Sequence, residues 1–329
     1  MNQITFFQQC IISSMIFMGF TAYAGVKEND TNRKSINQKT SKVELSYGPV
    51  KTLGIIKSKN LTELSGIVSG GKNKDLLWVH NDRDNLPYLY ALNQKAQTVG
   101  IYNLNLFNEE GFMDGDWEDI ARMPGEKKGD FYICIGDIGN NPMSPKVYKI
   151  LLVPEKLVTT DKIQNISFKT IKFTFPDGYI CNNEALLIDP VTKMIYIVSK
   201  KVKKNGKLLK NIHVWSIPAV TDYEKVYTAQ LVMKSIPLIE NNNLKVTGGD
   251  ISADGKLLIL ITDKSIAYLW ELDKDISMER NLSSTPVQIP LAKERGSEAI
   301  CFSLDKTKLF TVYDGKKVNR PLNMYPLKK

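Results

Sequence analysis

Carboxylates recur at two places in each of several similar segments of this chain. Each segment begins with a short strand-like stretch near an acid, turns tightly and continues into a second apolar stretch. The acids near the first stretches are Glu63, Glu118, Glu184, Asp250 and Glu298. The second stretches end on Asp82, Asp137, Lys200, Asp263 and Asp314, so Lys200 is the one base in this series. Crowded carboxylates raise one another's pKa values, and a hard cation such as Ca²⁺, which prefers oxygen ligands, would compensate for their charge.

The stretch 80–85 (HNDRDN) holds the densest set of reactive side chains. His80 could serve as a general base near neutral pH with Asp82 beside it, or it could be a strand residue bonded to a carbonyl. The chain has no G-x-S-x-G motif, and His213 is its only other histidine, so we do not expect a serine nucleophile in a triad.

Basic side chains are expected beside these acids. The sequence from Lys200 to Lys210 (KKVKKNGKLLK) reads as a loop between two strands of the third segment, at the same end as the carboxylates. Arg83, Lys200 and Lys201 are therefore candidate ligand-binding residues. Ammonium and guanidinium groups next to a metal would suit a small phosphorylated or carboxylated ligand.

The elements that must position these residues are strands. Runs of five to eight Val, Ile, Leu, Tyr and Phe residues lie between Gly, Pro, Asn and Asp clusters, which is typical of short strands. They fall into four groups of four and a last group of three, and 50–58 could supply its missing strand. This grouping predicts an all-β, five-bladed β-propeller closed by an N-terminal strand. Six blades remain possible if 138–183 hides another, and a β-sandwich is the weaker alternative.

A propeller would bring the starts of the first strands and the ends of the second strands to one mouth of its central channel. Only Glu118, Glu184 and Glu298 share the same phase relative to the apolar residues that follow. Glu63 and Asp250 are displaced from that phase, and Lys200 interrupts the second series. We therefore expect one off-centre site, with Glu63, Glu118, Asp137, Glu184, Asp250 and Glu298 as candidate Ca²⁺ ligands.

The N-terminal residues predict export. An apolar stretch followed by Ala22-Tyr23-Ala24 is typical of a cleaved signal peptide, here residues 1–24. Residues 25–43 read as a disordered basic arm, which leaves 44–329 as one propeller domain, in the periplasm or outside the cell. We expect no membrane span after signal removal, and a monomer.

The charge and the cysteine content of the chain limit the kinds of partner and cross-link that we expect. The net charge is +9, but no aromatic residues interleave the lysine runs, so we do not expect nucleic acid as a partner. Cys134, Cys181 and Cys301 remain after signal removal, which permits at most one disulfide, and Cys134 and Cys181 could be neighbours. The chain lacks a CxxC or Cys/His cluster, which excludes a structural zinc site.

Several motifs taken together resemble one group of exported bacterial β-propellers that lies near the phytase-like and gluconolactonase-like propellers. These motifs are ELSGI, LLWVHND, DWEDIA, YICIGDIGNN, CNNEALLIDP, VTGGDIS and SEAICFS. The resemblance implies export, and a mouth rimmed by Glu63, Glu118, Asp119, Asp137, Glu184, Asp250 and Glu298. It also implies Ca²⁺ and the hydrolysis of phosphate esters or lactones, by analogy across the fold. This chain lacks the long array of acids and lysines of a phytase phosphate site.

Two hypotheses follow. The first is a Ca²⁺-dependent hydrolase, or a binding site derived from one, that acts on a small anionic ester, with His80 and Asp82 as candidate catalytic residues. The second is a non-catalytic propeller that binds an extracytoplasmic protein or glycan. A scaffold of that kind would expose an apolar or aromatic patch on one face.

Overall fold

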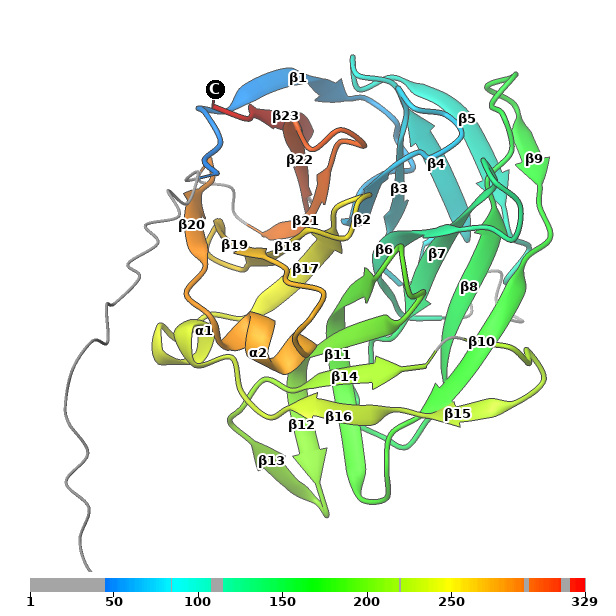
Figure 1. Cartoon of the computed structure of the whole chain (residues 1–329). Coiled ribbons are helices and arrows are strands. Elements are labelled where there is room, and N and C mark those ends of the chain that lie inside the picture. The colour runs from blue at the N-terminus through cyan, green and yellow to red at the C-terminus, as the bar shows by residue number, and fades with distance from the viewer. Residues whose placement is uncertain are drawn as a thin grey trace, which may run out of the picture. The chain divides into compact units, whose positions relative to one another are not determined.

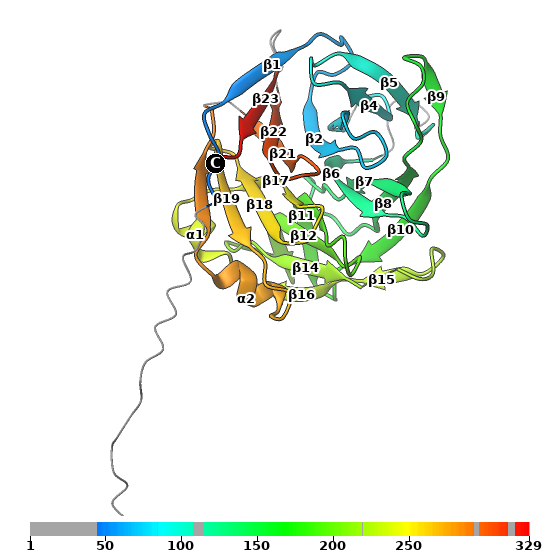
Figure 2. The same cartoon turned by 45° about the horizontal axis from the view of Figure 1, so that its top comes forward.

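Five small sheets surround a common axis in the computed structural model of the chain (Figure 1, Figure 2). The structure describes residues 45–83, 85–107, 115–218, 220–292, 296–314 and 320–328. Each sheet is one blade. Each innermost strand contacts the innermost strands of the next and the previous blade, so that β2, β6, β11, β17 and β21 close a ring. The predicted five-bladed propeller is confirmed.

The blades follow the order of the chain. The first contains β2 (Leu64–Ser69), β3 (Leu77–Asn81), β4 (Tyr88–Leu92), β5 (Thr98–Asn103) and β9 (Ile163–Asn165). The second contains β6 (Trp117–Pro124), β7 (Phe131–Asp137), β8 (Tyr148–Pro154), β10 (Lys169–Thr174) and β15 (Val226–Thr228). The third contains β11 (Tyr179–Ile188), β12 (Ile195–Lys204), β14 (Val214–Ile217) and β16 (Gln230–Met233), with β13 (Lys207–Leu209) paired to β12.

The fourth blade contains β17 (Val246–Ile251), β18 (Leu257–Thr262), β19 (Ile266–Glu271) and β20 (Val287–Pro290). The fifth contains β21 (Ser297–Phe302), β22 (Lys308–Tyr313), β23 (Arg320–Pro326) and, as predicted, the N-terminal strand β1 (Lys51–Ile56), which pairs antiparallel with β23. This pairing covers an edge that β23 would otherwise expose. Two short helices, α1 (Pro237–Asn241) and α2 (Met278–Ser283), connect strands of the third and fourth blades.

Apolar side chains fill the spaces between blades. The buried hydrophobic residues form five clusters, and each cluster joins two neighbouring blades around the ring. Aromatic residues are prominent in the cluster between the second and third blades, where the Phe175 ring meets that of Trp215 edge-on. A blade cannot bury its two faces alone, so the closed ring is what completes the core.

The open alternative of a sixth blade is resolved, because strands β8, β9 and β10 of the segment 138–183 belong to the first two sheets. Two details of the strand prediction were wrong. The short outer strands β9 and β15 were not anticipated, and both pair in parallel with the strand next to them. The predicted 200–210 loop is a hairpin, in which β12 runs on past the blade and returns through β13. The Asn205-Gly206 dipeptide, which favours a two-residue hairpin turn, was the sequence signal for this hairpin.

The expected signal peptide and basic arm lie outside the described residues. No helix in the described part of the chain is both long and apolar enough to cross a membrane.

Candidate functional site

The innermost strand of every blade carries a β-bulge at the same place. The register of each first hairpin shifts by one residue there, and the residue left out of the pairing is Ser65, Glu118, Glu184, Thr247 or Glu298. A bulge re-aims the side chain of its extra residue. The three glutamates that share one phase in the sequence are therefore the bulge residues of the second, third and fifth blades.

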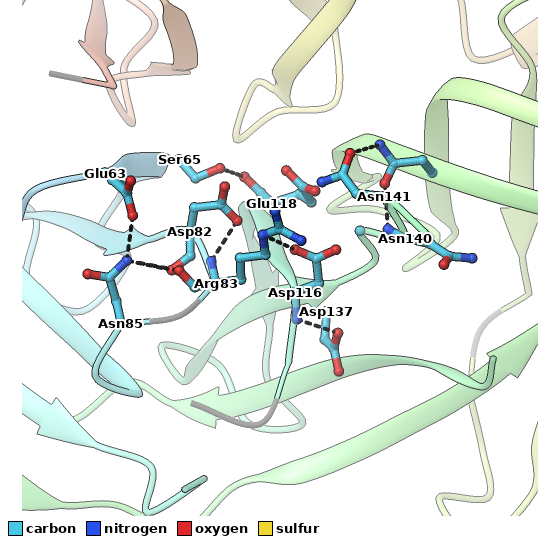
Figure 3. A network of polar contacts seen from close by, with 12 residues as sticks. Glu63, Ser65, Asp82, Arg83, Asn85, Asp116, Glu118, Asp137, Asn140 and Asn141 are labelled. Carbon is cyan, nitrogen blue, oxygen red and sulfur yellow. Dashed lines mark hydrogen bonds and ion pairs between the residues drawn. The ribbon is translucent and has the colours of Figure 1, made fainter. Parts of the chain in front are cut away.

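A pocket of about 320 Å³ lies where these bulges meet (Figure 3). Its lining is polar apart from Leu64, and four of the five blades contribute to it. The residues that line it are Glu63, Leu64, Ser65, Asp82, Arg83, Glu118, Asn141, Glu184, Lys200, Glu298 and Asp314. Six carboxylates thus face one small space with two basic side chains.

The two bulge residues that bear hydroxyl groups connect neighbouring blades. Ser65 Oγ donates a hydrogen bond to the carbonyl oxygen of Glu118 at 2.6 Å, and Thr247 Oγ1 donates to that of Ser297 at 2.7 Å. These bonds fix the spacing of adjacent innermost strands at the mouth, and therefore the positions from which the glutamate side chains extend.

Asp82, Asp116 and Glu118 form the tightest acidic group. One carboxylate oxygen from each lies within 4.8 Å of the others. Arg83 borders the group, because its Nε lies 4.0 Å from Asp116 Oδ1 and its backbone N–H donates to Asp82 Oδ1 at 2.6 Å (Figure 3). Asp116 Oδ1 is buried and accepts no hydrogen bond within the described residues. Three carboxylate oxygens at this separation could hold a metal ion.

The raised pKa values of the pocket carboxyl groups reflect the burial of several acids close together. Burial, and then the nearby Glu184 carboxylate, raises the pKa of Glu298 to about 8, and burial raises that of Asp82 to about 6. Burial also raises the pKa values of Asp116 and Glu118. Without a bound cation, several of these carboxyl groups therefore hold protons near neutral pH.

Lys200 is the basic residue that the third blade contributes to the pocket lining. Its Nζ lies 2.9 Å from Glu184 Oε1. Burial lowers the pKa of Lys200, but the carboxylates of Glu184, Glu298 and Glu118 outweigh burial and raise it overall. The pKa of Glu184 is raised by its own burial, an effect that Lys200 opposes. The ammonium group therefore stays charged within the pocket.

Seven of the predicted site residues line the pocket: Glu63, Asp82, Arg83, Glu118, Glu184, Lys200 and Glu298. Four others, His80, Asp137, Lys201 and Asp250, are not part of its lining. Lys201 lies on β12 opposite Asn182, one residue beyond the position from which Lys200 reaches the pocket.

Asp137 lies one position earlier in the second blade than Asp82 and Asp314 do in the first and fifth blades. It pairs with Trp117 on β6, as Asn81 pairs with Leu64 and Tyr313 with Ser297, so Ile138 takes the place that Asp82 and Asp314 occupy in their blades. A slip of one residue turns a strand side chain to the other face. Asp137 instead forms ion pairs with Lys146 at 3.1 Å and Lys149 at 3.8 Å. Its carboxylate also accepts the backbone N–H of Asp116 at 3.0 Å.

Asp250 lies deeper in the ring and serves the architecture. Its Oδ2 accepts the backbone N–H of Phe302 on the next blade at 2.9 Å. Burial raises its pKa to about 7, against the opposing charge of Arg122. Asp119 has a similar role: it accepts N–H groups from Ile120, Leu186 and Gly249, which belong to three different blades. Both carboxylates connect innermost strands and do not face the pocket.

His80 lies within the core. Its side chain has no solvent exposure, its Nδ1 lies 2.8 Å from the carbonyl oxygen of Asn81, and its ring meets Trp117 edge-on. Burial lowers its pKa to about 4, so the imidazole is neutral at physiological pH. His80 is therefore a buried strand residue next to a carbonyl oxygen, as in the second interpretation of the sequence, and it does not line the pocket.

Asp116 was not among the predicted site residues. It could have been found, because it precedes the bulge residue Glu118 by two positions, as Glu63 precedes Ser65. The three cysteines of the described chain, Cys134, Cys181 and Cys301, are buried and free, so no disulfide joins them.

Comparisons with known proteins add no family. No protein-family model matches the chain, and no curated protein matches it. Similar solved structures include the RRP9 WD40 repeats, with a TM-score of 0.43, 8% identity, and coverage of 87% of this chain and all of that one. The Cps50 (Swd1) β-propeller domain of Myceliophteria thermophila has a TM-score of 0.43 at 9% identity, covering 85% of this chain and all of that one. The Malassezia sympodialis allergen Mala s 1 has a TM-score of 0.49 at 10% identity, covering 83% of this chain and 95% of that one.

Proposed function

We propose that the pocket binds Ca²⁺ through Asp82, Asp116 and Glu118. The observation that carries this proposal is the convergence of these carboxylates within 4.8 Å, beside a pocket whose lining includes Asp82 and Glu118 with four further acids and two bases. Ca²⁺ accepts six to eight oxygen ligands in flexible geometry, and the lining offers further carboxylates and the Asn141 amide. The ion would favour the ionised forms of Asp82, Asp116 and Glu118, whose pKa values burial raises.

We further propose that the same pocket takes a small anionic ligand. Arg83 and Lys200 lie in the lining with the acids and would bind a phosphate or carboxylate group. Among the described residues, Leu64 is the one apolar residue in the pocket lining, which favours a small polar molecule over an apolar protein segment. The exported location inferred from residues 1–24 belongs to this proposal.

The reaction class that suits this set of residues is hydrolysis of a phosphate ester or lactone. A bound Ca²⁺ would supply polarisation of the phosphoryl or carbonyl oxygen. Arg83 and Lys200 would hold the anionic part of the substrate. Glu298 is not among the proposed Ca²⁺ ligands, and its pKa in the calcium-free protein is about 8. We propose that it donates its proton to the leaving alkoxide as a water molecule attacks the phosphoryl or carbonyl centre. This proton transfer replaces the general-base role predicted for His80.

The first experiment measures Ca²⁺ binding by isothermal titration and by thermal stabilisation of the mature protein. Asp116→Asn and Glu118→Gln should each weaken binding by about tenfold or more, because each removes a charged ligand. Asp263→Asn is the matched control: Asp263 follows β18 much as Asp82 follows β3, but its Oδ1 accepts the backbone N–H of Lys245 and it does not line the pocket. If Ca²⁺ neither binds nor stabilises the wild-type protein, the metal site is refuted.

A second experiment separates the enzyme from a binding module. Phosphomonoesters and lactones are offered to the Ca²⁺-loaded protein and to Lys200→Met, with and without chelator. Turnover that requires both Ca²⁺ and Lys200 supports the hydrolase. Ca²⁺ binding without any turnover would leave a non-catalytic site, the alternative derived from the sequence.

A further inference from the structure

The hairpin formed by the end of β12 and by β13 extends beyond the third blade (Figure 1). Its turn is Asn205-Gly206, and both residues have positive φ, 48° and 81°. Two successive residues with positive φ form the tight turn that matches the twist of a two-stranded ribbon. The hairpin is therefore a built element with a defined register: Lys204 opposite Lys207, Lys203 opposite Leu208, and Val202 opposite Leu209.

The two faces of this ribbon differ. Val202 is buried in the core between the second and third blades, and Leu209, opposite it, packs against the same cluster. Side chains alternate between faces along a strand, so Leu208 and Lys203 lie on the other face, where Lys203 also stands opposite Ile180 of β11. Leu208 is 61% exposed. The outer face thus presents an apolar side chain beside a lysine.

The hairpin carries a concentrated positive charge. Six lysines lie between Lys200 and Lys210, and no acidic residue occurs between Asp189 and Asp222. Within the described residues, only Lys200 of these six forms an ion pair. Like charges directly opposite one another, as Lys204 and Lys207 are, destabilise a strand pair. An anionic partner would relieve this repulsion.

We propose that this hairpin docks on an anionic lipid surface, with Leu208 entering the headgroup region and the surrounding lysines contacting acidic headgroups. Exposed apolar side chains among lysines are the mark of interfacial binding, because lysines attract anionic lipids and the apolar group gains by leaving water. A soluble polyanion would use the lysines but would gain nothing from Leu208. Lys200, at the base of the hairpin, lines the acidic pocket, so docking would bring the mouth of the pocket near the bilayer.

The test is co-sedimentation of the mature protein, in chelator, with phosphatidylcholine vesicles that contain about one-third phosphatidylglycerol. Binding is expected to these vesicles and not to phosphatidylcholine alone. Lys203→Gln with Lys210→Gln, two lysines on the same face as Leu208, should lower the partition coefficient by roughly 25-fold, from about fivefold for each lysine. Leu208→Ser should lower it by roughly tenfold.

Matched controls lie in turns at the opposite end of the blades. Lys127→Gln with Lys128→Gln, in the β6–β7 turn, removes the same charge, and Val191→Ser, in the β11–β12 turn, removes a side chain that is 75% exposed. Both should bind vesicles like wild type, and all variants should keep the wild-type thermal midpoint.

Three results would overturn the proposal. One is equal binding to neutral and anionic vesicles. Another is full vesicle binding by the hairpin variants, which would assign binding to other basic residues of the chain. The third is binding of inorganic polyphosphate that Leu208→Ser leaves intact, together with no binding to vesicles. The chelator keeps this test independent of the proposed Ca²⁺ site.

Discussion

The calcium-free protein should lose stability as the pH rises from about 5 to about 8, and Glu298 should be a main cause. Burial and the nearby Glu184 carboxylate raise the pKa of Glu298 to about 8, from an ordinary value of 4.5. Below the ordinary value the group is protonated in both the folded and the unfolded chain. Above it the unfolded chain releases the proton while the folded protein keeps it. The stability that this proton contributes at low pH is therefore lost as the pH rises through about 8.

The size of the loss follows from the pKa difference. A difference of about 3.5 pH units, at about 1.36 kcal/mol per unit, gives an upper value of about 5 kcal/mol. Glu118, Glu184 and Asp82 share the pocket and titrate together with Glu298, so the loss belongs to the set of carboxyl groups. We expect a decrease of roughly 3 to 5 kcal/mol in the free energy of unfolding, or roughly 10 °C in the thermal midpoint.

The assay is urea unfolding of the mature protein in chelator at a series of pH values. Glu298→Gln cannot ionise, so it should flatten the decrease and make the calcium-free protein more stable than wild type at about pH 8. Glu279→Gln, an exposed glutamate on α2, is the control and should follow the wild-type curve. The reasoning is refuted if wild-type stability is flat or rises over this range, or if Glu298→Gln retains the full decrease.

Three further predictions concern the residues that hold the ring together. Asp119→Ala leaves three buried backbone N–H groups without their acceptor and should lower the free energy of unfolding by about 3 to 5 kcal/mol, measured by urea unfolding. Glu155→Ala should cost about 3 kcal/mol in the same measurement, since this carboxylate accepts bonds from the N–H groups of Gly71, Lys72 and Asn73 and from Trp78 Nε1. Glu155→Gln should cost less. The thiols of Cys134, Cys181 and Cys301 should resist a thiol reagent in the native state and react fully in denaturant, because all three are buried. Fast native reaction of any of them would contradict the packing.

The sequence was sufficient to predict the ring of blades, because each blade repeats the same pattern of apolar runs separated by turn residues. It was also sufficient to predict that Glu118, Glu184 and Glu298 point to the same site. These residues have the same spacing from the apolar residues that follow them, and this spacing indicates the same backbone geometry, here a bulge. The same reasoning failed at Asp137, where the apolar run ends one residue early. The end of a run does not reveal which residue faces the channel, because that depends on the register with the neighbouring strand.

Asp250 and His80 show a second limit of the sequence. Both residue types are associated with chemistry, and both were candidates for that reason. Their surroundings decide otherwise: Asp250 is bonded to a backbone N–H of the next blade, and His80 has no exposed surface. Burial depends on how neighbouring blades meet, which is a property of the closed ring and not of any single segment.

The carboxylates of the ring fall into two groups that differ in what stabilises them. Asp119 and Asp137 accept backbone N–H groups, and Asp137 also pairs with lysines, so their charges are compensated within the fold. Within the described residues, the Glu118 and Glu298 carboxylates accept no hydrogen bond, although Glu118 is buried and Glu298 is half-buried. Burying an uncompensated carboxylate lowers stability, and such costs persist where function requires them. A glutamine at either position should stabilise the calcium-free protein, and it should weaken Ca²⁺ binding at position 118 and turnover at position 298. That pair of results would show that these two residues serve the site and not the fold.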